Sequence, residues 1–383
     1  MKRIAQLTVA AALVASTTTM VALPAGAKPA DTGWDDKVDY VVGSGSDTTY
    51  KVVSDLASIY NQAPGCTIAT SDTGTAPNFV APLAGDCVIN NQNATDIAGN
   101  WDHDVVVSKY PTGSSQGVKE LVDGRSDFAR SSRGPKTSGE SGTAFWGFAK
   151  DGIVVTTLGG RAPLNVTPAQ VKGIWNCTIT NWNQLDPSLP SATIHPYGMN
   201  PSSGTKATFD SFLGFDANAG SCVKKLNTGV FPFENDVKQI TENGAVGVPL
   251  ADAIWWGSYA EFKTYEYKRQ SAQFMTIGGV GIGNNSISNN SYPITRYVYH
   301  VTKTSSVAPA AGGLSTGATA GKAGAVREFT EWMCKPRAAH TVSDYTGVSL
   351  FDEATNAITG SGYLRIPNNE RSSGGVCSIA LAP

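Results

Sequence analysis

The sequence predicts an α/β protein, because short β-rich runs alternate with segments of helical periodicity along most of the chain. Three of these strand-to-helix junctions share one design, in which a loop of glycine and hydroxyl residues follows the strand and opens the helix. The length of 383 residues adds an expectation of two domains or two lobes, at roughly 150 residues each.

The first two strand–loop–helix units lie in the N-terminal third of the chain. Residues 40–42 (YVV) predict a strand, residues 43–49 (GSGSDTT) a loop, and residues 48–60 a helix with apolar side chains at helical spacing. In the second unit, residues 105–107 (VVV) predict a strand and residues 113–117 (GSSQG) a loop. One face of the helix that follows carries Val118, Leu121 and Val122.

The third unit runs from a strand at Thr193 and Ile194, through residues 202–205 (SSGT), to a helix whose apolar positions include Phe209, Phe212 and Leu213. We expect a last helix around residues 326–333. The remaining segments are expected to be irregular: a polar insertion at 61–100, a glycine- and asparagine-rich loop at 278–290, and a surface loop at 307–324.

The N-terminus has the features of a cleaved secretory signal in residues 1–27. Lys2 and Arg3 precede an apolar run at residues 4–14, and residues 25–27 (AGA) supply a small-x-small cleavage site. A membrane anchor is the alternative, but residues 16–19 (STTT) interrupt the apolar span. We therefore expect an exported protein, located outside the cell or in the periplasmic or cell-wall space.

Composition excludes several classes of partner. A formal charge of −2 gives no basic surface for nucleic acid or anionic lipid, and no second long apolar run predicts a polytopic membrane protein. Six cysteines in an exported chain indicate disulfides, and sequential pairing is favoured because each pair closes a local loop: Cys66–Cys87, Cys177–Cys222 and Cys334–Cys377. A metal site is disfavoured, since the chain has no C-x-x-C motif and only four histidines, and no cofactor is expected.

The three loops suit the binding of a compact oxyanion. The first N–H groups of each helix lack intrahelical partners and lie at the positive end of the helix dipole, while serine and threonine add hydroxyl donors. Simple helix capping by Ser46, Ser114 and Ser202 is the alternative, and it is favoured for any single loop. Three loops of one design shift the balance toward anion binding without deciding it.

Residues 127–133 (DFARSSR) add two hydroxyls, Ser131 and Ser132, and two guanidinium groups, Arg130 and Arg133. Guanidinium groups donate in pairs and suit tetrahedral oxyanions. A solvated turn with surface ion pairs explains the same residues equally well.

A competing interpretation is an exported serine hydrolase. Residues 113–117 match the G-x-S-x-G nucleophile elbow between a strand and a helix, which would make Ser115 the nucleophile. Its triad would be completed by an aspartate and a histidine, drawn from Asp127 or Asp252 and from His195, His300 or His340. The pattern is common by chance in a chain rich in glycine and serine, so this interpretation ranks second.

Taken in order, the motifs resemble those of the phosphate-binding proteins that feed ABC transporters, within the type II periplasmic-binding-protein superfamily. Residues 43–48 resemble the family's first glycine-rich loop, and residues 113–132 its second and third binding elements. Further matches lie at residues 179–182 (ITNW), 203–205 (SGT), 244–247 (GAVG) and 291–295 (SYPIT). Two positions depart from the family pattern: Met199 stands where an arginine is usual, and Ser132 where many members have an aspartate.

The resemblance implies a two-lobed α/β fold with crossover hinge strands. Lobe 1 would combine residues 34–158 and 295–383, and lobe 2 would span residues 159–294. A monomer would hold a small oxyanion, with phosphate favoured, for uptake by an ABC permease, and no covalent step would be needed. The expected ligand contacts are Ser46, Asp47, Thr48, Ser114, Arg130, Ser131, Ser132, Arg133, Ser203, Gly204 and Thr205. Here Arg130 or Arg133 would replace the missing arginine and Asp47 would accept the ligand's proton. The departures leave two alternatives, a different ligand or an extracellular module with a vestigial site.

Overall fold

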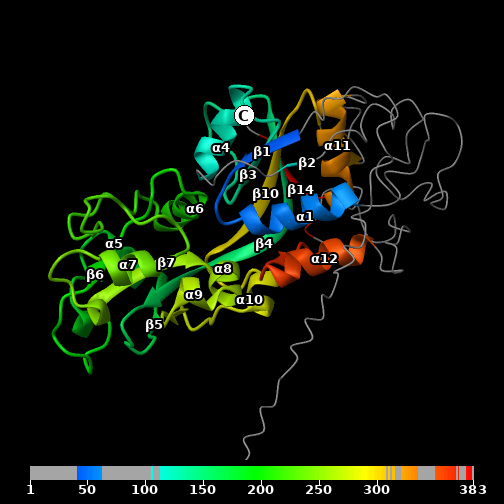
Figure 1. Cartoon of the computed structure of the whole chain (residues 1–383). Helices are drawn as coiled ribbons and strands as arrows, with labels where there is room; N and C mark the ends of the chain where they lie inside the picture. The colour runs from blue at the N-terminus through cyan, green and yellow to red at the C-terminus, as the bar shows by residue number, and fades with distance from the viewer. Residues whose placement is uncertain are drawn as a thin grey trace, which may run out of the picture.

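One mixed sheet of ten strands organises the chain (Figure 1). The computed structural model describes residues 41–62, 105–106, 113–307, 309–310, 313–314, 321–334, 350–367, 370 and 377–381. The strands of this sheet are β1 (Val41–Gly45), β2 (Val105–Val106), β3 (Phe128–Ser131), β4 (Thr143–Thr157), β6 (His195–Pro196), β7 (Ala253–Ser258), β8 (Gln273–Phe274), β10 (Thr295–Lys303), β13 (Leu364–Arg365) and β14 (Ser378–Leu381).

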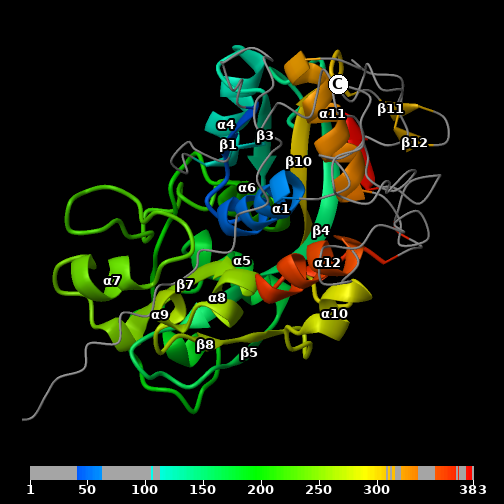
Figure 2. The same cartoon turned by 45° about the vertical axis from the view of Figure 1, so that its right-hand side comes forward.

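Seven of the strands are hydrogen-bonded in the order β2-β1-β3-β10-β4-β7-β6. The other three, β8, β13 and β14, each pair with β4. Strand β4 is fully buried over its 15 residues. Its first ten residues pair β10 antiparallel, and residues 153–157 pair β7. Strands β4 and β10 therefore run together through the middle of the molecule and connect its two halves (Figure 2).

The first half contains β1, β2, β3, the N-terminal part of β4 and the C-terminal part of β10. Its helices are α1 (Tyr50–Gln62), α4 (Ser114–Val122), α11 (Gly321–Cys334) and α12 (Leu350–Gly360). Helices α1, α11 and α12 bury Val52, Leu56, Phe329 and Ile358 in one apolar core, and α4 buries Val118 and Leu121 in another. Burial of this apolar area is the main force that fixes the helices on the sheet.

The second half surrounds the far end of β4 with β6 and β7. Its helices are α5 (Pro168–Trp175), α6 (Gly204–Leu213), α7 (Lys238–Asn243), α8 (Tyr259–Thr264), α9 (Glu266–Arg269) and α10 (Asn284–Ser288), with short 3₁₀ turns at Trp182–Gln184 and Leu250–Asp252. The core here is aromatic, with Trp175, Phe209 and Trp256 in mutual ring contact. Two minor sheets pair β5 (Asn165–Val166) with β9 (Thr276–Ile277), and β11 (Pro309–Ala310) with β12 (Gly313–Leu314).

Local sequence explains where α5 and α6 begin and end. Thr167 caps α5 in a reciprocal pair with Gln170, and Pro168 occupies the first helical position, where its missing N–H costs nothing. Ser203 caps α6 by accepting from the Lys206 N–H. Gly214 ends α6 in the left-handed conformation, at φ 84°.

The predicted α/β class and two-lobed fold are confirmed, with local corrections. The third strand lies at His195–Pro196 instead of residues 193–194, and Val122 points to solvent, because the helix ends there. The segment expected to be a loop at 278–290 contains α10, and the one at 307–324 contains the β11–β12 hairpin and the start of α11. The lobe boundaries near residues 158 and 294 stay predictions.

Two of the three expected disulfides are present, Cys177–Cys222 and Cys334–Cys377. The signal segment at 1–27, the Cys66–Cys87 pair and most of the insertion at 61–100 lie outside the described residues. In the part of the chain that the structure describes, no helix is long and apolar enough to cross a membrane.

Candidate functional site: a junction of four loops

Three hydroxyls from the first half of the molecule meet at one point. Ser46 follows β1, Ser114 begins α4 and Ser132 follows β3, and all three are fully buried. The Ser46 hydroxyl donates to Ser132 Oγ at 3.1 Å, and the hydroxyls of Ser114 and Ser132 lie 3.3 Å apart. The Ser132 N–H donates to Ser114 Oγ at 3.0 Å. The parallel pairing of β1 with β3 brings their carboxyl ends, and hence these loops, to the same edge of the sheet.

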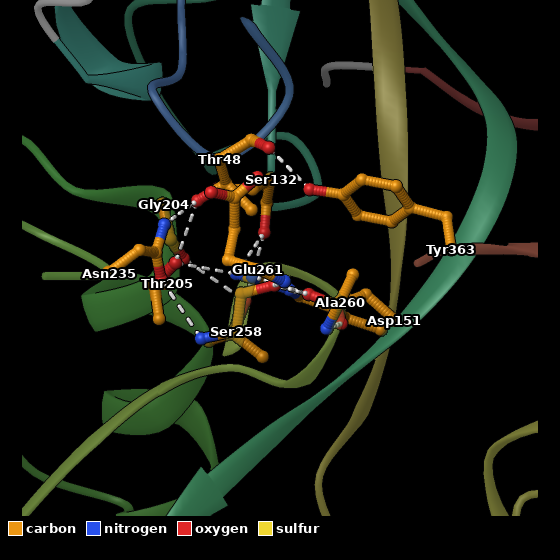
Figure 3. A network of polar contacts seen from close by, with 12 residues as sticks. Thr48, Ser132, Asp151, Gly204, Thr205, Asn235, Ser258, Ala260, Glu261 and Tyr363 are labelled. Carbon is orange, nitrogen blue, oxygen red and sulfur yellow. Dashed lines mark hydrogen bonds and ion pairs between the residues drawn. The ribbon is translucent and has the colours of Figure 1, made fainter. Parts of the chain in front are cut away.

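The N-terminus of α6 meets this group from the second half. The Ser115 N–H donates to the Ser202 carbonyl at 3.2 Å, and Thr48 and Thr205 share a hydrogen bond of 3.2 Å between their hydroxyls (Figure 3). Thr205 is fully buried and also accepts from Arg296 Nη1 at 2.9 Å. The loops that the sequence singled out therefore lie together at the junction of the two halves.

Two glycines allow this close approach. A Cβ on Gly204 would lie 2.2 Å from Ser114 Oγ and 2.4 Å from Ser132 Oγ. Gly113 has φ 95°, a conformation that side chains disfavour, and a Cβ there would lie 2.5 Å from the Ser202 carbonyl oxygen. The glycines of the second and third loops thus serve the contact between the loops.

Two residues at the junction were missed by the sequence analysis. The buried Glu234 carboxylate accepts from the Ser203 hydroxyl and, at 3.4 Å, from the Thr205 N–H, so a negative group lies at the start of α6. Its other oxygen, Oε1, is buried without a hydrogen-bond partner. Asn235 donates to Thr48 Oγ1 at 2.8 Å and accepts from the Ser258 N–H at 2.9 Å.

No motif marks Glu234 or Asn235, because residues 231–236 (FPFEND) form a loop with neither a helical nor a strand pattern. Met199, at the position where the resemblance leads us to expect an arginine, is fully buried, and its sulfur accepts from the Ser203 hydroxyl at 3.2 Å. An apolar side chain and a carboxylate thus surround Ser203.

The two arginines proposed as counter-charges have other partners. The buried Arg130 guanidinium donates to the carbonyl groups of Gly43, Gly45 and Ser46, and so supports the first loop from behind. Burial lowers its pKa to about 10. Arg133 pairs with Glu140. The cation that contacts the junction is Arg296, which the sequence analysis did not select.

Ser131 also turns away from the junction. Its hydroxyl donates to the Arg133 carbonyl at 2.8 Å and accepts from the Arg133 N–H at 3.3 Å, which stabilises the turn after β3. Asp47 is half-buried beside the junction. Burial, and next the negative charge of Glu234, raise the pKa of Asp47 to about 6.

The raised pKa of Asp47 predicts a pH-dependent stability. The folded state holds this proton more tightly than the unfolded chain, so the free energy of unfolding falls as the pH rises from about 4 to about 6. We expect Asp47→Asn to stabilise the protein by about 1–3 kcal/mol at pH 7.5 and by little at pH 4.5. Urea unfolding at both pH values measures the difference. Asp55→Asn, at a carboxylate paired with Lys51 on the surface, is the control, and an equal gain at both pH values for Asp47→Asn would contradict the assignment.

The hydrolase interpretation finds no triad among the described residues. Ser115 Oγ accepts from Arg133 Nε at 3.4 Å, and a guanidinium cannot act as a base. The candidate aspartates have other roles, since Asp127 accepts from the Val42 N–H and Asp252 pairs with Arg161.

The candidate histidines do not reach Ser115 either. His300 is fully buried between Phe128 and Phe329, and burial lowers its pKa to about 3. His195 lies on β6 in the other half, and His340 lies outside the described residues. Within the described ranges, no group of three or more His, Cys, Asp or Glu side chains could hold a metal ion.

Comparison with known proteins places this geometry in a family. No curated protein matches the chain. The solved structures that share its fold include one described as a phosphate ABC transporter substrate-binding protein with bound phosphate from Clostridium perfringens, and an ABC-type phosphate transport receptor from Vibrio cholerae. The first is 18% identical with a TM-score of 0.54, covering 86% of this chain and 100% of its own. The second is 18% identical with a TM-score of 0.52, covering 85% of this chain and 100% of its own. The PBP superfamily domain matches residues 30–337, and the chain therefore belongs to the periplasmic-binding-protein superfamily.

Proposed function

We propose that the mature chain is an exported solute-binding protein that captures a small oxyanion, with orthophosphate the favoured ligand, and presents it to an ABC permease. The observation that carries this proposal is the convergence of the buried hydroxyls of Ser46, Thr48, Ser114, Ser132 and Thr205 at the N-termini of α4 and α6. Both structures of the same fold named above belong to proteins described as phosphate receptors.

The hydroxyls at the junction bond to one another, so an oxyanion would exchange these bonds for bonds to its own oxygens. The positive end of the α6 dipole would favour its charge, and the Arg296 guanidinium, which is paired with Asp151, would add an N–H donor beside Thr205. The unpartnered oxygen of Glu234 needs a hydrogen donor. Hydrogen phosphate brings a proton at neutral pH and sulfate does not, so we assign to Glu234 the proton-accepting role first expected of Asp47.

Calorimetric titration of the mature protein with orthophosphate tests this function. Binding should release or absorb measurable heat and raise the thermal midpoint, because a ligand selective for the folded state stabilises it by about 2.7 kcal/mol at a hundred times its Kd. Sulfate should bind more weakly. Absence of heat and of a midpoint shift with phosphate, sulfate and phosphonates would favour the vestigial-site alternative.

Thr205→Ala should weaken phosphate binding by about 1–3 kcal/mol, because it removes a ligand hydroxyl and leaves Thr48 and Arg296 without one of their partners. The same titration measures the change. Thr180→Ala, at an exposed threonine in the second half, is the matched control and should bind phosphate like the wild type. Equal affinity of Thr205→Ala and the wild type would show that the ligand does not reach the start of α6.

A further inference from the structure

A cavity of about 450 Å³ lies on the side of the junction where β4 and β10 cross between the halves, and its volume is in the range of small-molecule sites. Its walls come from the turn after β3, the outer face of α6 and the two crossing strands. The charged and aromatic residues that line it are Arg133, Lys136, Lys150, Arg296, Tyr297 and Tyr299. None of Ser46, Ser114, Ser132, Ser203 and Thr205 lines it, and Arg296 is the residue that it shares with the oxyanion junction.

The charges around this cavity leave one cation unbalanced. Arg133 pairs with Glu140, and Arg296 pairs with Asp151 at 2.7 Å. Lys150 pairs with Glu370 at 2.8 Å. Lys136, the fourth cation, is exposed and has no ion-pair partner among the described residues. Burial first, and then the neighbouring Arg133, lower the pKa of Lys136, while Glu140 opposes this.

The lining combines polar and apolar surface and offers hydrogen bonds. Tyr299 contributes a hydroxyl, and Thr208, Ser211 and Asn290 contribute further polar groups. Its apolar surface comes from Ala207, Pro135 and the two tyrosine rings, and it lies beside these polar groups. Aromatic rings beside hydroxyl and amide groups suit a molecule with several hydroxyls.

We propose that this cavity, the hinge pocket, binds a monoanionic, polyhydroxylated molecule of the sugar-acid class in addition to the oxyanion. Two lining residues connect it to the junction: Arg296 Nη1 and Thr208 Oγ1 both donate to the Ser132 carbonyl, at 3.1 and 3.3 Å. Because both halves and the crossing strands contribute to the pocket, its occupant contacts every part that moves when the lobes open.

The test uses D-gluconate as the probe, with the oxyanion junction filled by saturating phosphate. Gluconate should raise the thermal midpoint further and give calorimetric heat, whereas neutral glucose and acetate should give much less. Lys136→Glu should weaken gluconate binding at least about tenfold by reversing the unbalanced charge. Ser211→Trp should abolish it by filling the pocket from the exposed face of α6.

Two controls separate this proposal from the oxyanion function. Lys225→Glu reverses an exposed lysine that does not line the pocket and should bind gluconate like the wild type. Both pocket variants should bind phosphate as the wild type does, and this is measured independently. No response of the wild type to gluconate, or an equal response in Lys136→Glu and Ser211→Trp, would overturn the hinge pocket whatever the result with phosphate.

Discussion

Gly204→Val is expected to reduce phosphate affinity at least 100-fold, which corresponds to about 2.8 kcal/mol. The first side-chain carbon would already lie 2.2 and 2.4 Å from the hydroxyls of Ser114 and Ser132. Either these hydroxyls rotate away from the ligand or the two halves separate, and the valine methyl groups then occupy the space of the oxyanion. Both outcomes remove the donors on which binding depends.

The substitution should leave the fold intact, because Gly204 is the first residue of α6 and has no positive φ. We therefore expect the protein to fold with a free energy of unfolding lowered by about 1–3 kcal/mol through overpacking, while small-angle scattering shows a more open molecule. Gly283→Val is the matched control, since Gly283 is extended at φ −177° and a Cβ there meets no atom within 4 Å. Wild-type affinity in Gly204→Val would mean that phosphate binds elsewhere.

The fold was largely predictable, because each strand–loop–helix unit is encoded by local patterns. The apolar spacing in residues 48–60 and around Val118 places α1 and α4 within a few residues of their observed bounds. Strand β4 shows why the rest was not. It combines polar and apolar residues over 15 positions, and all are buried because β10 and β7 pair along its edges while α8, α10 and α11 pack against it. Such burial depends on tertiary contacts, so the local pattern of polar and apolar residues does not predict it.

The hydroxyl part of the site was also predictable, because Ser46, Ser114 and Thr205 stand at helix starts or strand ends that a motif can mark. The charged part was not. The sequence predicts that Arg130 contacts the ligand, but its guanidinium donates instead to three backbone carbonyls at the first loop. Arg296 lies about 90 residues from the nearest loop and reaches Thr205 only through the antiparallel pairing of β10 with β4.

Met199 stands where the resemblance predicts an arginine, and its surroundings show what replaces that charge. An arginine at this position would face Glu234 across Ser203, where the structure instead has a thioether at 3.2 Å from the hydroxyl. Glu234 is left without a cationic partner among the described residues, and its carboxylate takes the Ser203 and Thr205 donors. This arrangement favours a ligand that can donate a hydrogen bond to the Glu234 carboxylate. It also explains why the sequence of the loops does not predict a site of net positive charge.

Arg296→Met should destabilise the protein by about 3–5 kcal/mol, the cost of leaving a buried charge without its partner. Arg296 and Asp151 face each other across β10 and β4, with side chains 3% and 0% exposed, and Asp151 also accepts from the Ser258 hydroxyl and the Ala260 N–H. Urea unfolding at neutral pH measures the loss. Lys119→Met breaks an exposed pair with Asp123 and should change stability little.

The double variant Arg296→Met with Asp151→Asn distinguishes a lost ion pair from lost packing. Removing the carboxylate charge should recover at least half of the stability lost in Arg296→Met, because an asparagine oxygen can still accept from Ser258 while no buried charge remains. If the double variant is no more stable than Arg296→Met, the arginine acts mainly through its bonds to Ser132 and Thr205. A loss below about 1 kcal/mol in the single variant would instead mean that water replaces the guanidinium, and that the crossing strands are open to solvent at Asp151.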